Sequence, residues 1–187
     1  FKNIFVLPGT ASALLLGGEG GGQVWWNLFF ALLIACLTAS ANYTLNELLD
    51  AASDRHHPTK QDRPIPRGLI STRLAVFQYA TLATVSAVTA YFLGQLFFWT
   101  IIVFLLLGVA YNVRPLRTKD RPYLDVVSES ANNAVRLLLG WAVVAPDSLP
   151  PVSIILAFWL GGAYLMAVKR YAEYRKIDDP VVAAKYR

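Results

Sequence analysis

Three oxygen-bearing side chains follow one another at intervals of four residues where a long apolar segment ends. On a helix, Asn46, Asp50 and Asp54 would lie on one face, each about one turn from the next. The segment before them, residues 20–45, carries no charge over 26 residues and is long enough to cross a bilayer as a helix. Carboxylates at the end of such a helix are costly unless another charge compensates them. A hard divalent cation would do so, and this row of oxygens therefore predicts a magnesium site.

The predicted metal site indicates a phosphate-bearing ligand. Two carboxylates and an amide supply part of the octahedral shell that Mg²⁺ requires, and a diphosphate and water can complete it. A metal ion with arginine and lysine beside it neutralises the charge that develops on a leaving diphosphate. The carbon–oxygen bond of the donor then breaks to leave a carbocation, which a nucleophile captures. The segment that follows the row, residues 54–68, has the turn-forming prolines and glycine, and the cations, to close over such an anion.

Charge-free segments indicate which elements must hold these side chains in place. The segment 74–113 is 40 residues long, too long for one crossing, and Gly94-Gln95 marks the turn between two helices. The fold class is then all-α, a polytopic transmembrane helical bundle that forms one membrane domain over residues 1–187. Because the chain starts at Phe1 and its one methionine is Met166, we expect it to be a fragment. The six expected spans lie at residues 4–18, 24–45, two within 74–113, 128–144 and 152–168.

The composition and the distribution of charge agree with a membrane location. The 187 residues are 56% hydrophobic and their mean hydropathy is +0.44, too apolar for an ordinary soluble domain. Threaded through six spans, all 17 basic residues, Arg136 included, are expected on one side, whereas the opposite loops hold Glu19 and Asp147. This asymmetry predicts a multi-pass protein of the cell's inner membrane with its charged loops in the cytoplasm. The net charge of +5 belongs to that polar face, which argues against a nucleic-acid partner.

The same residue types are compatible with several different roles. Basic residues at helix ends often snorkel to the interface and fix orientation without taking part in chemistry. Lys169 and Glu173, four residues apart at the end of the last apolar segment, can form a structural ion pair. A membrane transporter would also use intramembrane acids to bind a cation, but it would be expected to carry charge in mid-span, whereas the acids here lie near one edge. A CDP-alcohol phosphotransferase would need an Asp-Gly-x-x-Ala-Arg stretch, which this sequence lacks.

Two stretches of the sequence resemble the UbiA superfamily of intramembrane prenyltransferases. The first aspartate-rich motif of that family and its trailing loop are similar to Asn46-Glu47-x-x-Asp50-x-x-x-Asp54 and residues 60–68. The second cytoplasmic loop of the family is similar to Tyr111 with Pro115 and Lys119. The resemblance implies an all-helical fold of about nine spans around a central cavity, a Mg²⁺-bound diphosphate donor and a polyprenyl lipid substrate. This chain would then be the first six spans, incomplete at both ends.

Two departures from the family pattern resemble one branch of it. Glu47 stands where the family usually has aspartate, which lengthens the acidic arm. On the sixth span, Lys169-Arg170-Tyr171-Ala172-Glu173 replaces the second Asp-x-x-x-Asp motif. This pattern resembles the branch that transfers phosphoribosyl from phosphoribosyl diphosphate to decaprenyl phosphate. The resemblance thus implies phosphoribosyl transfer to a polyprenyl phosphate, with prenyl transfer from a polyprenyl diphosphate to an aromatic or other small acceptor as the alternative.

The residues assigned to the site follow from this interpretation. The predicted metal ligands are Asn46, Asp50 and Asp54. The predicted catalytic residues are Asp50, Asp54, Lys119, Asp125, Lys169 and Glu173. The predicted substrate-binding residues are Asn46, Lys60, Arg63, Arg67, Arg117, Arg136 and Arg170. The extra cations of the second and third polar segments suit a site that holds two phosphorylated substrates.

Overall fold

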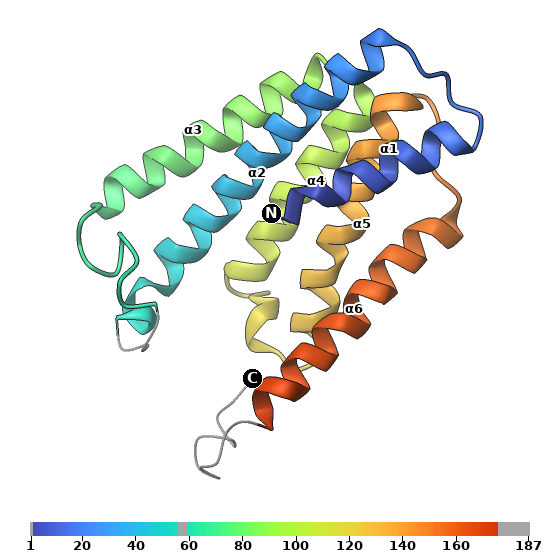
Figure 1. Ribbon diagram of the computed structural model, residues 1–187. Helices are drawn as coiled ribbons and strands as arrows, with labels where there is room; N and C mark the ends of the chain where they lie inside the picture. The colour runs from blue at the N-terminus through green and yellow to red at the C-terminus, as the bar shows by residue number, and fades with distance from the viewer. Residues whose placement is uncertain (1, 56–59, 176–187) are drawn as a thin grey trace.

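The structure, a computed structural model, describes residues 2–55 and 60–175, without the side chains of Lys2, Glu173 and Tyr174. Within these residues every regular element is helical, which confirms the predicted all-α bundle (Figure 1). The six α-helices are α1 (Val6–Leu15), α2 (Gly22–Asp54), α3 (Thr72–Tyr91), α4 (Gln95–Asn112), α5 (Leu124–Val144) and α6 (Val152–Tyr174). Two short 3-10 helices, η1 (Lys2–Phe5) and η2 (Thr118–Asp120), precede α1 and α5.

Local sequence signals set several helix ends. The hydroxyl of Ser71 caps α3 by accepting a hydrogen bond from the Leu74 backbone N–H at 3.3 Å. The turn between α3 and α4 lies at the predicted position, and Gly94 adopts a φ of 126°, which a side chain would make unfavourable. The acidic row belongs to α2, which continues without a break to Asp54, so the four-residue spacing is helical as expected.

Helix α5 lies at the centre of the bundle. It packs against α1, α2, α4 and α6, while α3 is held at the edge by α2 and α4 (Figure 1). The α1–α5 contact brings the two backbones together, because a Cβ added to Gly9 would collide with the Leu137 carbonyl oxygen. The Thr10 hydroxyl reinforces this contact by donating to the Gly140 carbonyl oxygen at 3.0 Å. The hydrophobic core lies between α2, α4 and α5, with contributions from α1 and the end of α3.

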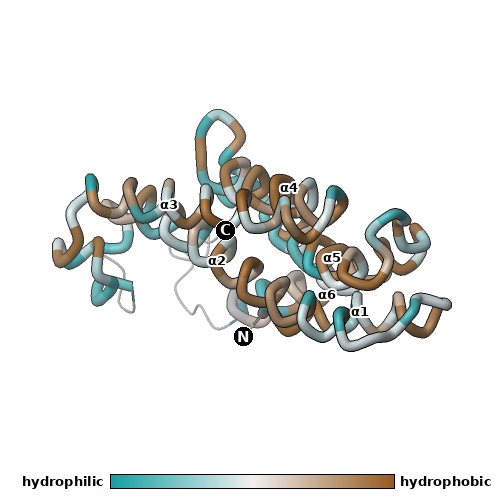
Figure 2. Tube along the Cα trace, turned by 90° about the horizontal axis from the view of Figure 1, so that it is seen from above, coloured by the Kyte–Doolittle hydropathy of each residue, from teal (hydrophilic) through white to brown (hydrophobic). Residues whose placement is uncertain are grey.

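Four helices in the described part of the chain are long and apolar enough to cross a membrane: α2, α3, α4 and residues 152–172 of α6. Of the other two predicted spans, α1 has ten residues, and α5 has 21 residues but carries Asp125, Glu129 and Arg136. Its surface is largely covered by the other helices, and a helix enclosed by protein can carry charge at membrane depth. Hydrophobic and hydrophilic residues are interspersed along the helices, and brown is prominent around α4 (Figure 2).

The polar segments gather at one end of the bundle. The α2–α3 connection, the segment around η2 and the end of α6 lie together at the bottom of Figure 1. The α1–α2, α3–α4 and α5–α6 connections lie at the other end. Arg136 is an exception to the expected distribution, because it lies past the middle of α5 and not in a polar loop. Charge counting assigned it wrongly to the polar face, because it treated every basic residue as lying outside the spans, whereas Arg136 is buried among the helices.

Candidate active site

Lys119 joins three side-chain oxygens at the polar end of the bundle. Its Nζ lies 2.7 Å from Asp50 Oδ1, 3.0 Å from Asn46 Oδ1 and 2.9 Å from Asn112 Oδ1. Lys119 is 2% exposed, so the ammonium is withdrawn from water, and the three oxygens match its three N–H donors. We call Lys119, Asn46, Asp50 and Asn112 the lysine junction. It places the loop that contains η2 against the ends of α2 and α4.

A second cation reaches the same carboxylate. Arg117 Nη2 donates to Asp50 Oδ1 at 2.9 Å, and Arg117 Nε donates to Asp120 Oδ2 at 2.6 Å. Asp50 is 8% exposed, and a buried carboxylate without such partners would be strongly destabilising. The two predicted cations of the second polar segment, Arg117 and Lys119, therefore converge on one predicted acid.

Asp54 forms a separate ion-paired group one turn further along α2. Arg63 Nη1 donates to Asp54 Oδ2 at 2.8 Å, and Lys60 Nζ lies 3.9 Å from Asp54 Oδ1. The carboxylate is almost fully buried beneath the α2–α3 loop. This loop was expected to cover the acids with its cations, and Arg63 and Lys60 have that position. Arg67 does not, because its side chain is exposed and forms no hydrogen bond or ion pair with the described residues.

Two further hydrogen bonds fasten the loop to α2. The Ile65 backbone N–H donates to Glu47 Oε1 at 2.8 Å, and Arg55 Nε donates to the Pro66 carbonyl oxygen at 3.2 Å. Glu47 is the residue that departs from the family's usual aspartate, and its longer arm reaches the loop backbone. In this structure it positions the loop.

Asp125 connects three helices at the same end. Its Oδ2 accepts hydrogen bonds from Arg170 Nε at 3.0 Å and Nη2 at 2.9 Å, which ties α6 to α5. Its Oδ1 accepts a 2.7 Å hydrogen bond from the Tyr111 hydroxyl of α4, and this hydroxyl lies 3.4 Å from Glu129 Oε2. Asp125 is 5% exposed, so this pairing compensates a third buried acid.

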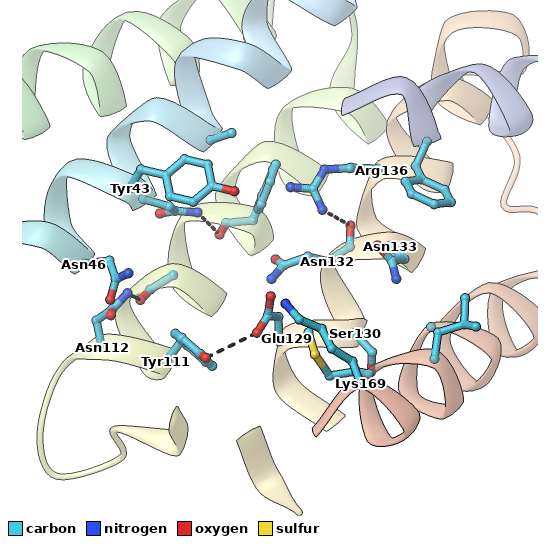
Figure 3. A pocket seen from close by; sticks show the side chains of 18 residues that line it. Tyr43, Asn46, Tyr111, Asn112, Glu129, Ser130, Asn132, Asn133, Arg136 and Lys169 are labelled. Atoms are coloured by element: carbon cyan, nitrogen blue, oxygen red, sulfur yellow. Dashed lines mark hydrogen bonds between the residues drawn. The ribbon is translucent and has the colours of Figure 1, made fainter. Parts of the chain in front are cut away.

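A cavity of about 390 Å³ opens between α2, α4, α5 and α6. Asn46, Asn112 and Tyr111 lie on one side of it, and Asn132, Asn133 and Arg136 on the other (Figure 3). Eleven of its eighteen lining residues carry polar side chains. The polar lining residues are Asn42, Tyr43, Asn46, Tyr111, Asn112, Glu129, Ser130, Asn132, Asn133, Arg136 and Lys169. The others are Phe5, Ala39, Phe104, Gly108, Gly162, Leu165 and Met166.

Arg136 lines this cavity from α5, and its direct contacts are neutral groups. Its Nε donates to Asn3 Oδ1 at 3.0 Å, and its Nη1 donates to the Asn132 carbonyl oxygen at 3.1 Å. The guanidinium carbon lies 4.9 Å from the centre of the Phe104 ring, a cation–π contact. Arg136 is 5% exposed, which makes it a buried cation in mid-helix.

Sequence reasoning missed much of the cavity wall. Glu129, Asn132 and Asn133 of α5 share a face with Arg136, since their spacing of three, four and seven residues matches the helical period. That polar face on an otherwise apolar helix was the available signal. Lys169 was predicted and lines the cavity. Glu173 belongs to the last turn of α6, but its side chain is outside what the structure describes, so its predicted pairing with Lys169 is not visible.

The oxygens around Lys119 show that this position is built for a cation. Three oxygen ligands from Asn46, Asp50 and Asn112 converge on one point, and hard divalent cations prefer such ligands. No three Asp, Glu, His or Cys side chains come together as a metal site within residues 2–55 and 60–175. A divalent cation at this point would therefore need substrate oxygens or water to complete its shell.

Comparison with known proteins identifies the family. A sequence model described as the UbiA prenyltransferase family matches residues 5–187. The chain belongs to this family. Decaprenyl-phosphate phosphoribosyltransferase of Mycobacterium tuberculosis is 29% identical over 178 residues, which are 92% of this chain and 56% of that protein. Protoheme IX farnesyltransferase of Alcanivorax borkumensis is 26% identical over 185 residues, which are 96% of this chain and 61% of that protein.

The bundle also matches a solved UbiA structure. A UbiA homolog from Archaeoglobus fulgidus bound to DMAPP and Mg²⁺ aligns with a TM-score of 0.78 at 21% identity. The alignment covers 93% of this chain and 61% of that chain, and it establishes a shared UbiA fold. This chain thus spans between about half and three fifths of the UbiA proteins it matches. UbiA membership favours a membrane transferase over the transporter considered from sequence.

Proposed function

We propose that this chain forms the donor site of a membrane transferase that moves phosphoribosyl from phosphoribosyl diphosphate to a polyprenyl phosphate. The observation that carries the proposal is the polarity of the cavity. Five asparagines, Arg136, Glu129 and Lys169 line it. An isoprenoid chain in this space would remove these groups from water without offering them hydrogen bonds, which is costly. A phosphorylated pentose offers acceptors and hydroxyl donors throughout.

The lysine junction and the Asp54 group would hold the leaving diphosphate. Lys119 and Arg117 on Asp50, and Arg63 and Lys60 on Asp54, bring four cations to two acids. Asn46, Asp50 and Asp54 would hold Mg²⁺, which neutralises charge on the diphosphate and orients it when bound. The arginines and lysines can then turn from the carboxylates to the phosphate oxygens, with bidentate hydrogen bonds available from the arginines.

The reaction is a substitution at C1 of the ribose. The bond from C1 to the diphosphate oxygen breaks, and its electron pair leaves with the diphosphate. An oxygen of the polyprenyl phosphate forms the new bond to C1, through a transition state with oxocarbenium character. The acceptor oxygen is already ionised at neutral pH, so no strong general base is required. Lys169 faces the same cavity from α6 and is suited to attract that second phosphate.

Prenyl transfer from a polyprenyl diphosphate to a small acceptor is the second candidate. It is favoured by the relative named protoheme IX farnesyltransferase and by the A. fulgidus homolog bound to DMAPP. The diphosphate group would bind the same residues in either reaction. The two candidates therefore differ in what the polar cavity receives.

The protein would lie in the cell's inner membrane with the polar end of the bundle toward the cytoplasm. The polar end carries most of the basic residues, and positive charge is retained on the cytoplasmic side. The soluble donor would then enter from the cytoplasm, while the lipid acceptor arrives within the bilayer.

A two-donor assay tests the function. Membranes that contain the full-length protein are supplied with polyprenyl phosphate, a small aromatic acceptor and Mg²⁺, with either radiolabelled phosphoribosyl diphosphate or radiolabelled prenyl diphosphate. We expect label in the lipid extract from the phosphoribosyl donor, and loss of that label with EDTA or in Asp50→Asn. Label transferred from the prenyl donor alone, or from neither donor, would overturn the proposal.

A further inference from the structure

Arg136 is the buried charge that the diphosphate chemistry does not use. It lies eleven residues beyond Asp125 on α5, about 16 Å deeper along the helix axis at 1.5 Å per residue. The cations on Asp50 and Asp54 lie at the polar end of the bundle, where Asn46 and Asn112 of the lysine junction line the cavity, and Arg136 lines the cavity deeper in the bundle. Figure 3 shows Arg136 across the cavity from Asn46 and Asn112.

The guanidinium forms no ion pair with the described residues, and Glu129 of the same cavity attracts it only from beyond ion-pair distance. Its contacts are an amide oxygen, a carbonyl oxygen and an aromatic ring, from Asn3, Asn132 and Phe104. Burying a charge without an ion-pair partner is expensive, so a buried arginine whose direct contacts are all neutral indicates that an anion belongs beside it. Its Nη2 donates no hydrogen bond to the described residues. This terminal amino group of the guanidinium is therefore available to a ligand in the cavity.

We propose that Arg136 binds the non-leaving phosphate of the donor, a phosphomonoester at the opposite end of the sugar from the diphosphate. The proposal rests on the proposed function and extends it to the inner end of the cavity. Guanidinium geometry matches phosphate oxygens, and the amides of Asn132 and Asn133 on the same wall suit the sugar hydroxyls between the two phosphates. The cavity thus recognises a ligand that is anionic at both ends.

This arrangement discriminates between donors. A prenyl diphosphate is anionic at one end and would place its hydrocarbon tail against Arg136. A pentose with phosphate groups at both ends compensates Arg136 and the lysine junction at once. A cavity of about 390 Å³ lies within the range of small-molecule sites.

The test compares ligands that carry one or both anionic ends. The full-length protein in detergent is studied as wild type, Arg136→Met, Arg136→Lys and Arg114→Met. Methionine preserves a long apolar side chain against Phe104, and Arg114 is an exposed arginine outside the cavity, so its variant is the matched control. The probes are ribose 5-phosphate without metal, and methylenediphosphonate with Mg²⁺. Binding is followed by the shift in melting temperature and by inhibition of transfer.

In Arg136→Met, we expect the affinity for ribose 5-phosphate to fall, and the KM for phosphoribosyl diphosphate to rise, by about tenfold or more. This is the change expected from the loss of one charge-assisted hydrogen bond. Affinity for methylenediphosphonate should change less than about twofold. Arg136→Lys should fall between wild type and Arg136→Met, and Arg114→Met should match wild type.

Two outcomes would overturn the proposal. One is ribose 5-phosphate binding that is unchanged in folded Arg136→Met and Arg136→Lys. The other is an equal loss for both probes in these variants, which would assign Arg136 to the leaving group or to folding. The melting shift with ribose 5-phosphate needs no turnover, so it stays informative even if the two-donor assay rejects phosphoribosyl transfer.

Discussion

Lys119 Nζ and Asp50 Oδ1 lie 2.7 Å apart although the two residues are separated by 69 positions in the chain. This buried pair fixes the loop between α4 and α5 against the acidic row of α2. It also means that the row is already neutralised by the protein's own cations before any ligand arrives. Donor binding must therefore redistribute charge among groups that are in place.

Loss of the Asp50 or Asp54 carboxylate is expected to stop turnover. Asp50→Asn leaves Lys119 and Arg117 facing a neutral amide, and Asp54→Asn does the same to Arg63. Each variant should lose at least about a hundredfold in transfer rate, of the order seen when an electrostatic partner of the reacting group is removed. Radiolabel transfer in membranes measures this. Each variant should insert normally, as should the control Asp147→Asn in an opposite connection, and near-normal turnover in either variant would refute the metal and diphosphate assignment.

Removal of Lys119 should separate metal binding from catalysis. In the wild type a divalent cation at Asn46 and Asp50 must displace or repel the ammonium that their oxygens already bind. Lys119→Met removes this competitor, so we expect Mn²⁺ to bind more tightly in the absence of donor by about tenfold, while turnover falls. Electron paramagnetic resonance of free Mn²⁺ gives the affinity. Unchanged or weaker Mn²⁺ binding would argue against a metal position shared with the ammonium.

Two neighbouring glycines of α6 make a matched pair. A Cβ on Gly162 would collide with Asn133 Nδ2, whereas one on Gly161 would meet open space. Gly162→Ala should push the Asn133 amide into the cavity and raise the donor KM several-fold, with a stability cost of about 1 kcal/mol. Gly161→Ala should leave KM unchanged and be neutral or slightly stabilising, because alanine favours the helix. Steady-state kinetics and thermal melting measure both. Equal effects at the two positions would show that Asn133 does not shape the donor site.

The proposed orientation can be read from two exposed acids. In a full-length protein whose cysteines, Cys36 among them, are replaced by serine, Glu19→Cys and Asp62→Cys place single thiols at opposite ends of the bundle. We expect an impermeant maleimide to label Glu19→Cys in intact cells, and Asp62→Cys after the membrane is permeabilised, because the basic end faces the cytoplasm. The reverse pattern would invert the topology and place donor entry outside the cell.

The sequence allowed the helices to be predicted well because charge is costly in a bilayer. The turn at Gly94 and the extension of α2 to Asp54 both followed from charge-free segments and four-residue spacing. The same rule failed for α5, where Arg136 was counted as part of a loop although other helices enclose it. Whether neighbouring helices enclose a polar side chain depends on the tertiary packing, so a local sequence pattern does not predict it.

Which basic residue pairs with which acid also could not be predicted from the sequence. Four basic residues of two loops could have faced either Asp50 or Asp54, and the choice depends on how the short η2 helix presents Arg117 and Lys119. Arg67 has the same charge and lies in the same loop as Arg63, yet it faces solvent. Which lysine or arginine reaches an acid is decided by loop geometry, which composition does not encode.

The polar face of α5 has a consequence for biogenesis. A helix that carries Glu129, two asparagines and Arg136 is poorly suited to leave the translocon alone, because an arginine at the centre of an isolated span costs about 2.5–3.5 kcal/mol even on insertion scales. Helices α1, α2 and α4, which enclose much of α5, are all made before it. The nascent chain can therefore receive α5 directly into a prepared protein surface. The order of helices along the chain then spares α5 exposure to lipid.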